Sequence, residues 1–310
     1  MRVFLAGATG VIGRRLLPQL LAAGHEVTGM TRSPERAEQV RAAGAGAVVA
    51  DALDAEAVRS AVADAAPQAV IHQLTALPAR IDPRRIERDF VLNDRLRGEG
   101  TRILVDAAQA AGATRVVAQS IAFVYEPGPR GTIHREQDPL VRNPPPSFAR
   151  SARAVAELEQ SVLGAGGVVL RYGYFYGPGS AISAAGSMGE DVRRRRMPVV
   201  GRGAGVWSFI HVDDAAAATV AALQAGSGGV YNIVDDEPAA VAEWLPALAH
   251  ALGAPRPLRV PTPIARLAAG SYGVATMTRA QGASNALAKR ELGWTPAHPS
   301  WREGFRTALG

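Results

Sequence analysis

The sequence predicts an α/β fold in which a parallel β-sheet carries helices on both of its faces. Short apolar runs of strand length alternate with helical patterns through the first half of the chain, an order typical of doubly wound sheets. A glycine-rich turn follows the first apolar run and leads directly into a helical pattern. With 310 residues, the chain is long enough for one large domain or two smaller ones.

The first strand, turn and helix occupy the N-terminus. The apolar run 3–6 predicts a buried strand, and leucines at 16, 17, 20 and 21 recur at helical spacing. Between them, Gly7 allows a tight turn, Gly10 lets a ligand approach the backbone, and Gly13 lets the helix pack on the strand. This order predicts dinucleotide binding, with the pyrophosphate at the helix N-terminus. The alternative is a glycine-rich turn that binds no ligand.

The remaining elements extend this pattern. Further strands are predicted at 25–30, 47–50, 69–72, 115–120 and 167–171, with helices at about 34–43, 54–65, 86–111 and 148–163. The proline-rich stretch 126–147 predicts a surface loop, and 211–214 and 229–233 are expected to return to the sheet as strands. We therefore expect a Rossmann-type dinucleotide-binding domain at 1–172, completed by parts of 205–235, and a smaller, mainly substrate-binding lobe at 173–310.

Composition narrows the function further. The chain has no cysteine, which excludes disulfides, thiolate nucleophiles and cysteine-ligated metals. No apolar run has membrane-spanning length, and the first run is too short for a signal peptide, so a cytoplasmic protein without a membrane partner is expected. The net charge is +6, but the arginine cluster 193–196 has no interleaved aromatic residues and no nucleic-acid motif. A small-molecule substrate is expected, and no nucleic acid.

Several motifs, taken in order, resemble the extended short-chain dehydrogenase/reductase family, the NAD-dependent epimerase/dehydratase group. The resemblance covers nearly the whole chain and depends on the segments 7–13, 70–72, 124–125, 170–179, 209–214, 230–232 and 288–294. It implies that the pyrophosphate lies against Gly7, Thr9, Gly10, Val11, Ile12 and Gly13. It further implies contacts to the adenine from Asp51 and Ala52, and to the nicotinamide side from Gln73, Leu74, Thr75, Ala76 and Gln119. Family members often form homodimers through the helices at about 86–111 and 148–163.

The end of the second strand bears on the choice of cofactor. Enzymes that use NAD(H) need a carboxylate there for the ribose hydroxyls, whereas this chain has Thr31-Arg32-Ser33. An arginine flanked by hydroxyls complements a 2′-phosphate through charge-assisted hydrogen bonds. The sequence therefore predicts NADP(H) rather than NAD(H). The alternative is that Arg32 is a surface residue that stacks on the adenine.

The chain departs from the family in its catalytic residues. The family uses a Ser or Thr, a Tyr, and a Lys four residues after the Tyr. The Lys lowers the pKa of the Tyr so that it can transfer a proton. Aligned on Tyr125, these positions fall at Ile121, at Phe148 or Ala149, and at Ala152 or Arg153. The only lysine is Lys289, and no tyrosine lies between Tyr125 and Tyr172. Arginine stays protonated and does not relay a proton as lysine does, so the family mechanism is lost.

The remaining candidates for proton chemistry are Tyr174, Tyr125 and Ser120, which lie near predicted strand ends. Substrate contacts are expected from Ile121, Phe148 and Tyr174. Tyr174 stands where sugar-nucleotide enzymes of the family have an Asn that contacts the diphosphate, which argues for a flatter or more apolar substrate. No His and carboxylate spacing predicts a metal site, and His211 is expected to be structural.

Three classes of function remain open. The first is an atypical NADP(H)-dependent oxidoreductase that acts on a small, non-nucleotide substrate without the Tyr-x-x-x-Lys mechanism. The second is a non-redox enzyme on the same fold, such as a cyclase, isomerase or dehydratase. The third is a redox-inert protein that senses or binds NADP(H).

Overall fold

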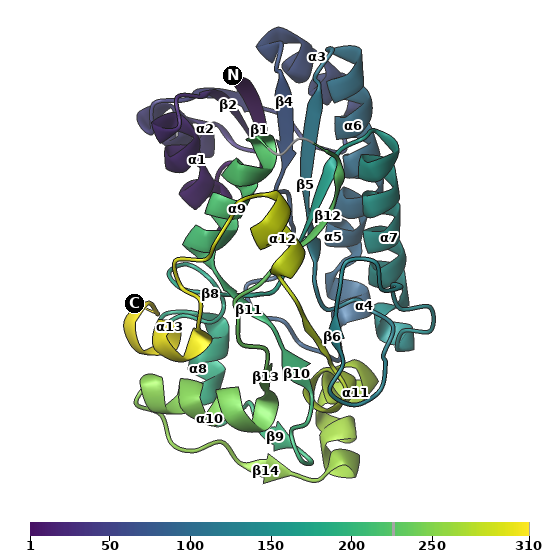
Figure 1. Ribbon diagram of the computed structural model, residues 1–310, viewed down its shortest axis with the longest axis vertical. Coiled ribbons are helices and arrows are strands. Elements are labelled where there is room, and N and C mark those ends of the chain that lie inside the picture. Colours follow the sequence, from purple (N-terminus) through teal and green to yellow (C-terminus); the bar gives the residue numbers. More distant parts are fainter. Residues whose placement is uncertain (225–226, 310) are drawn as a thin grey trace.

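The computed structural model describes residues 1–224 and 227–309. Its centre is a sheet of seven parallel strands in the order β12-β7-β5-β4-β1-β2-β3 (Figure 1). These strands are β1 (Arg2–Ala6), β2 (Glu26–Thr31), β3 (Gly46–Val49), β4 (Ala69–His72), β5 (Arg115–Ile121), β7 (Val168–Tyr172) and β12 (Gly229–Ile233). The predicted doubly wound sheet is confirmed. The strand order reverses between β1 and β4, which is where such sheets bind ligands.

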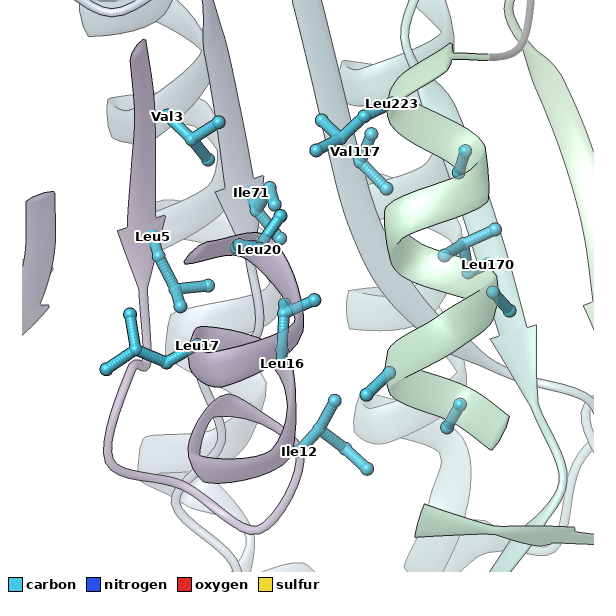
Figure 2. Close-up of a cluster of buried hydrophobic side chains, with 14 of the residues drawn as sticks. Val3, Leu5, Ile12, Leu16, Leu17, Leu20, Ile71, Val117, Leu170 and Leu223 are labelled. Carbon is cyan, nitrogen blue, oxygen red and sulfur yellow. The ribbon is translucent and has the colours of Figure 1, made fainter. Parts of the chain in front are cut away.

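Helices cover both faces of this sheet and form an apolar core on each. One face carries α1 (Gly13–Ala22), α2 (Pro34–Ala42) and α9 (Val212–Gln224), and the other carries α3 (Ala55–Ala65), α6 (Thr101–Ala110) and α7 (Ala149–Gly164). Figure 2 shows Leu16 and Leu20 of α1 and Leu223 of α9 in the apolar layer that covers the strands. Among the described residues, no helix is both long enough and apolar enough to cross a membrane.

The smaller lobe follows β7 and is built from short strands and helices (Figure 1). Its elements are β8 (Tyr174–Tyr176), α8 (Ser187–Arg193), β9 (Val199–Val200), β10 (Val206–Trp207), β11 (Phe209–His211), β13 (Ala239–Ala240), α10 (Val241–Ala251), β14 (Arg259–Val260), α11 (Thr262–Thr278), β15 (Gly282–Ala283) and α13 (Trp301–Thr307). Helix α12 (Ala286–Glu291) packs instead against β12 and the core of the main sheet. Aromatic side chains fill the core of this lobe, including Phe209, Trp244 and Trp301. Helix α11 kinks at Gly270, where φ is 68°.

One predicted strand is wrong. Residues 211–214 do not join the main sheet: His211 ends β11, which pairs with β8, and α9 begins at Val212. Asp213 and Asp214 lie in the first turn of α9, where carboxylates interact favourably with the helix dipole. Residues 229–233, in contrast, pair with β7 at the edge of the main sheet as expected.

The predicted long helix at 86–111 is also wrong, because the segment is broken into four pieces. These are α4 (Ile86–Asp89), α5 (Val91–Arg95), a π-helical turn η1 (Leu96–Gly100) and α6. A Cβ on Gly98 would lie 2.7 Å from Oε2 of Glu157 in α7, so the glycine permits close packing of η1 on α7. Single π turns are frequent at functional sites.

The proline-rich stretch 126–147 is attached to the smaller lobe. It contains β6 (Ile133–His134), which pairs with β15, and it ends at the 3-10 turn η2 (Pro146–Phe148). The Gln281 amide donates hydrogen bonds to the carbonyls of Gly128 and Pro129 and accepts one from the Gly128 N–H. This stretch is therefore held in place by the C-terminal part of the chain.

Candidate functional site

The glycine turn between β1 and α1 has the shape that a bound dinucleotide requires. Gly7 has a φ of +96°, and a Cβ there would lie 2.7 Å from the Gln73 carbonyl oxygen. A Cβ on Gly13 would lie 2.1 Å from the Gly7 carbonyl oxygen. Packing within the protein therefore explains why positions 7 and 13 need glycine. It does not explain Gly10, because that residue is exposed and a Cβ there would meet only the Gly7 carbonyl, at 3.4 Å.

The turn also presents hydrogen-bond donors. The N–H groups of Val11 and Ile12 donate to no residue that the structure describes, and they precede the first turn of α1. Thr9 is almost buried, and its carbonyl accepts a hydrogen bond from Nε of Arg14 at 2.9 Å, which fixes the turn. Free backbone donors at a helix N-terminus bind anions. The residues present therefore fit the pyrophosphate of a nicotinamide dinucleotide.

The loop after β4 is held rigidly beside this turn. Burial lowers the pKa of His72 to about 4, so its ring is neutral near pH 7. Its Nε2 donates to Oγ1 of Thr101 at 2.9 Å, and its Nδ1 accepts the Leu74 N–H at 3.1 Å. The Gln119 amide donates to the Leu74 carbonyl at 2.8 Å, and Asn93 accepts the Ala76 N–H.

Two side chains of this loop remain available to a ligand. Thr75 is exposed, and Oε1 of Gln73 is buried without a hydrogen-bond partner among the described residues. The amide group of Gln73 donates to the Tyr172 hydroxyl at 3.0 Å, which fixes the orientation of this unpaired oxygen.

The residues that are predicted to contact the adenine end of the cofactor lie at the end of β2 and after β3. Asp51 is exposed and accepts the Leu53 N–H at 3.0 Å, and Ala52 is buried. Arg32 is exposed and makes no hydrogen bond or ion pair with a described residue. Ser33 caps α2 by accepting the Arg36 N–H, so its hydroxyl is already partly used.

Two of the predicted catalytic residues belong to a buried polar network. Arg171 of β7 binds Glu159 of α7 through two hydrogen bonds, of 2.6 and 2.8 Å. The Ser120 hydroxyl donates to the same carboxylate at 2.7 Å. Nη1 of Arg171 also donates to the Tyr125 hydroxyl at 2.9 Å, and that hydroxyl donates to Oδ1 of Asn232 at 2.5 Å.

These contacts favour a structural role for Ser120 and Tyr125 over the predicted catalytic one. Both hydroxyls are committed to partners, and burial raises the pKa of Tyr125. The pairing of Glu159 with Arg171 was not predicted from the sequence. A buried arginine in a strand is itself a signal that a carboxylate lies opposite, but the identity of that carboxylate depends on how α7 packs.

A cavity of about 170 Å³ lies between the stretch 126–147 and α11. Tyr174, Tyr125 and Phe148 line it, whereas Ser120 and Ile121 do not. The Tyr174 ring is stacked between Phe123 and Trp207, with ring centroids 4.4 and 3.8 Å away. Its hydroxyl makes no hydrogen bond with a described residue, and burial raises its pKa well above the ordinary value. Ile121 instead packs in the apolar cluster of Phe148 and Val155.

The far wall of this cavity, which was not predicted from the sequence, belongs to the end of α11. Its lining residues are Tyr272, Ala275, Thr276 and Arg279. They recur at helical spacing, a pattern that is visible in the sequence. Tyr272 stacks on Phe148 with centroids 4.7 Å apart. Arg279 is exposed and has no hydrogen-bond or ion-pair partner among the described residues, so the cavity combines aromatic walls with one free guanidinium.

The fold also brings together His211, Asp213 and His298, whose potential ligand atoms lie within 4.8 Å of one another. The two rings are 3.9 Å apart, and Nδ1 of His211 accepts the Asp213 N–H at 3.3 Å. Asp213 also pairs with Arg15 at 3.6 Å, which compensates its charge. This grouping was not predicted from the sequence because His298 is distant from His211 and Asp213 along the chain. None of the three residues lines the aromatic cavity.

Comparisons with known proteins agree with this geometry. Residues 3–234 match the NAD dependent epimerase/dehydratase family. A 3-diazoavenalumate denitrifying reductase from a Streptomyces species is 47% identical over 308 residues, covering 98% of this chain and 99% of that protein. A 4-hydroxy-2-methyl-3-oxo-4-farnesyl-3,4-dihydroquinoline-1-oxide ketoreductase from Stigmatella aurantiaca is 29% identical, covering 82% and 74% of the two chains.

Solved structures show the same fold. The UDP-glucose 4-epimerase of Thermus thermophilus, in complex with NAD, has a TM-score of 0.76 and 25% identity over 100% of this chain and 98% of that chain. The human epimerase family protein SDR39U1, with NADPH, has a TM-score of 0.74 and 22% identity, covering 100% of this chain and 99% of that chain.

Proposed function

The chain belongs to the NAD dependent epimerase/dehydratase family and is a reductase of that family, and from this premise we propose that it uses NADPH to remove the diazo group of a small aromatic carboxylate as N₂. The observation that carries the proposal is the aromatic cavity with a free guanidinium, in a chain that lacks the Tyr and Lys of the family. Its near full-length similarity to a diazo-removing reductase supports the same choice.

The absence of the family's Tyr and Lys is compatible with this chemistry. Reduction of a carbonyl leaves an alkoxide that needs a proton, and the family's Tyr and Lys supply it. An aryl diazonium group needs no such proton: its C–N bond breaks, N₂ leaves with the bonding electron pair, and hydride forms the new C–H bond. When bound, a reduced nicotinamide supplies that hydride. The hydride neutralises the positive charge of the diazonium group, so this reaction does not need the proton relay that the chain lacks.

The cavity fits the rest of such a substrate. Phe123, Phe148 and Tyr272 contribute aromatic side chains to its wall, and a flat aromatic ring packs well against such surfaces. Arg279 makes no ion pair with a residue that the structure describes, and its guanidinium can bind a substrate carboxylate through paired hydrogen bonds. The raised pKa of Tyr174 keeps its hydroxyl protonated and therefore able to donate a hydrogen bond.

The proposed reaction is tested with 3-diazoavenalumate and NADPH that is deuterated at the nicotinamide C4. We expect N₂ release and NADPH oxidation in equal amounts, with deuterium on the ring carbon that carried the diazo group. Simple ketones and enones are expected to be poor substrates, because no group with a lowered pKa protonates them. N₂ release without NADPH oxidation would instead support a non-redox enzyme, and no turnover of any compound would support a binding protein.

The preference for NADP(H) is attributed to Arg32, which is exposed at the end of β2 without a partner among the described residues. Changing Arg32→Ala is expected to weaken NADPH binding by about tenfold or more while NADH binding stays nearly the same, because only NADPH carries the 2′-phosphate. Dissociation constants of both cofactors are measured by calorimetry. Arg59→Ala, which removes an exposed arginine from α3, serves as the control. An unchanged NADPH-to-NADH ratio in the Arg32 variant would contradict the assignment.

A further inference from the structure

We propose that His211, Asp213 and His298 form a binding site for a divalent transition metal ion, Zn²⁺. One potential ligand atom of each residue lies within 4.8 Å of the other two. Ligand atoms about 2.1 Å from a tetrahedral ion lie about 3.4 Å from one another, so small side-chain rotations bring these three atoms onto one ion. Two imidazoles and a carboxylate are ligands that zinc prefers. None of the three residues lines the aromatic cavity, so the inference does not depend on the proposed function.

The fold holds His211 in a form that binds metals. The residue is 2% exposed at the end of β11, and a Cβ on Gly177 would lie 2.4 Å from its Nε2, so the ring is packed in place. Its Nδ1 accepts the Asp213 N–H at 3.3 Å, which leaves the proton on Nε2. Burial and the neighbouring His298 ring lower the pKa of His211, so its ring is neutral near pH 7. A neutral imidazole nitrogen is the form that metals bind.

Asp213 supplies the carboxylate. Its Oδ2 lies 3.7 Å from Nδ1 of His211, close to the separation of two ligands on one ion. Its side chain is 46% exposed, and its Oδ1 lies 3.6 Å from Nε of Arg15 in α1. Exposed ion pairs of this kind contribute little to stability. We therefore expect Arg15 to turn toward solvent at low cost when a metal ion takes the carboxylate.

The third ligand, His298, belongs to the segment that precedes α13. The N–H groups of Ala297 and His298 donate to the two carboxylate oxygens of Asp214, at 2.8 and 2.9 Å. Asp214 is buried in the first turn of α9, so it fixes the backbone of His298 beside the start of that helix. The His298 and His211 rings are 3.9 Å apart. The site thus joins the C-terminal part of the chain to α9.

The other histidines define the controls. The chain has no cysteine, and His72 and His134 use both of their ring nitrogens in hydrogen bonds. His250 is exposed on α10. His25 places Nδ1 3.4 Å from the N-terminal amine, a second pair of groups that can hold a metal ion. A test must therefore distinguish the site at His211 from the one at His25.

The inference is tested by titrating Zn²⁺ into the full-length, tag-free protein after treatment with a chelator. Calorimetry is expected to show one ion bound per chain. The unfolding temperature is expected to rise with Zn²⁺ concentration, because the three ligands come together only in the folded state. X-ray absorption at the zinc edge is expected to show two imidazole ligands. Absence of Zn²⁺ binding, or a bound ion with fewer than two imidazoles, would overturn the inference.

Four variants locate the ion. His298→Ala and Asp213→Asn each remove one ligand and are expected to weaken Zn²⁺ binding about tenfold or more. Neither residue is fully buried, so both variants are expected to fold. His25→Ala and His250→Ala are the matched controls and are expected to bind Zn²⁺ as tightly as the wild type. Unchanged affinity in both ligand variants, or loss of binding in His25→Ala, would place the ion elsewhere and overturn the inference.

Arg15→Met is expected to change the affinity in the opposite direction. It removes the guanidinium that competes for the Asp213 carboxylate, together with a positive charge near the ion. Zn²⁺ is therefore expected to bind about two- to fivefold more tightly, the factor that corresponds to an exposed ion pair. The gain is expected to disappear when Arg15→Met is combined with Asp213→Asn. If Arg15→Met binds Zn²⁺ no more tightly than the wild type, Asp213 is not a ligand and the assignment is wrong.

Discussion

Replacing Arg171 by methionine is expected to lower the free energy of unfolding by about 3–5 kcal/mol. The side chains of Arg171 and Glu159 are each only 5% exposed, and the pair joins β7 to α7. Removing the guanidinium leaves the buried Glu159 carboxylate with a hydrogen bond from the Ser120 hydroxyl alone among the described residues, and it also removes a donor from Tyr125. The measurement is urea denaturation of the wild type and the variant, followed by tryptophan fluorescence.

Two controls accompany this experiment. Arg102→Met breaks an exposed pair with Glu157 at 3.6 Å and is expected to cost at most about 1 kcal/mol, because solvent screens it. Ser120→Ala removes one hydrogen bond and is expected to cost about 1–3 kcal/mol while leaving kcat nearly unchanged. A large loss of kcat in a stable Ser120→Ala protein would restore Ser120 as a catalytic residue. A loss below about 1 kcal/mol for Arg171→Met would show that the network does not stabilise the fold.

Changing Gly13→Ala is expected to remove cofactor binding and to destabilise the protein by about 1–3 kcal/mol. The new Cβ would lie 2.1 Å from the Gly7 carbonyl oxygen, and its other near neighbours are backbone atoms of Ala8, so no flexible side chain can move to make room. We expect relief of this clash to move α1 away from β1, and with it the N–H groups that are predicted to bind the pyrophosphate. Calorimetry with NADPH and thermal unfolding measure the two effects.

Gly10→Ala is the matched comparison, because the protein leaves room for a Cβ at that position. Stability is expected to stay within about 0.5 kcal/mol of the wild type. NADPH affinity is nevertheless expected to fall about tenfold or more, since the methyl group occupies the space through which the pyrophosphate approaches. If Gly10→Ala binds NADPH as tightly as the wild type, the phosphates do not lie against Gly10 and the predicted placement of the cofactor is wrong.

Most of the main sheet could be predicted because strands and helices are encoded locally. The runs 3–6, 69–72 and 167–171 predicted three of its strands, and their alternation with helices predicted a doubly wound parallel sheet. Errors arose where packing overrides local pattern. The segment 86–111 has helical periodicity, yet close contact of Gly98 with α7 coincides with a π turn that the periodicity does not reveal.

The sequence by itself determined two facts about this protein: a strand, glycine turn and helix typical of dinucleotide binding, and the absence of the Tyr and Lys on which the family's proton transfer depends. Only the tertiary structure decided which polar groups are used and which are free. It joins Ser120, Glu159 and Arg171 in one buried network, and it brings Arg279, which has no ion-pair partner among the described residues, to the same cavity as Tyr174. The physical reason is that periodicity and turn chemistry act over a few neighbouring residues, whereas the partner of a buried charge comes from whichever distant element packs against it.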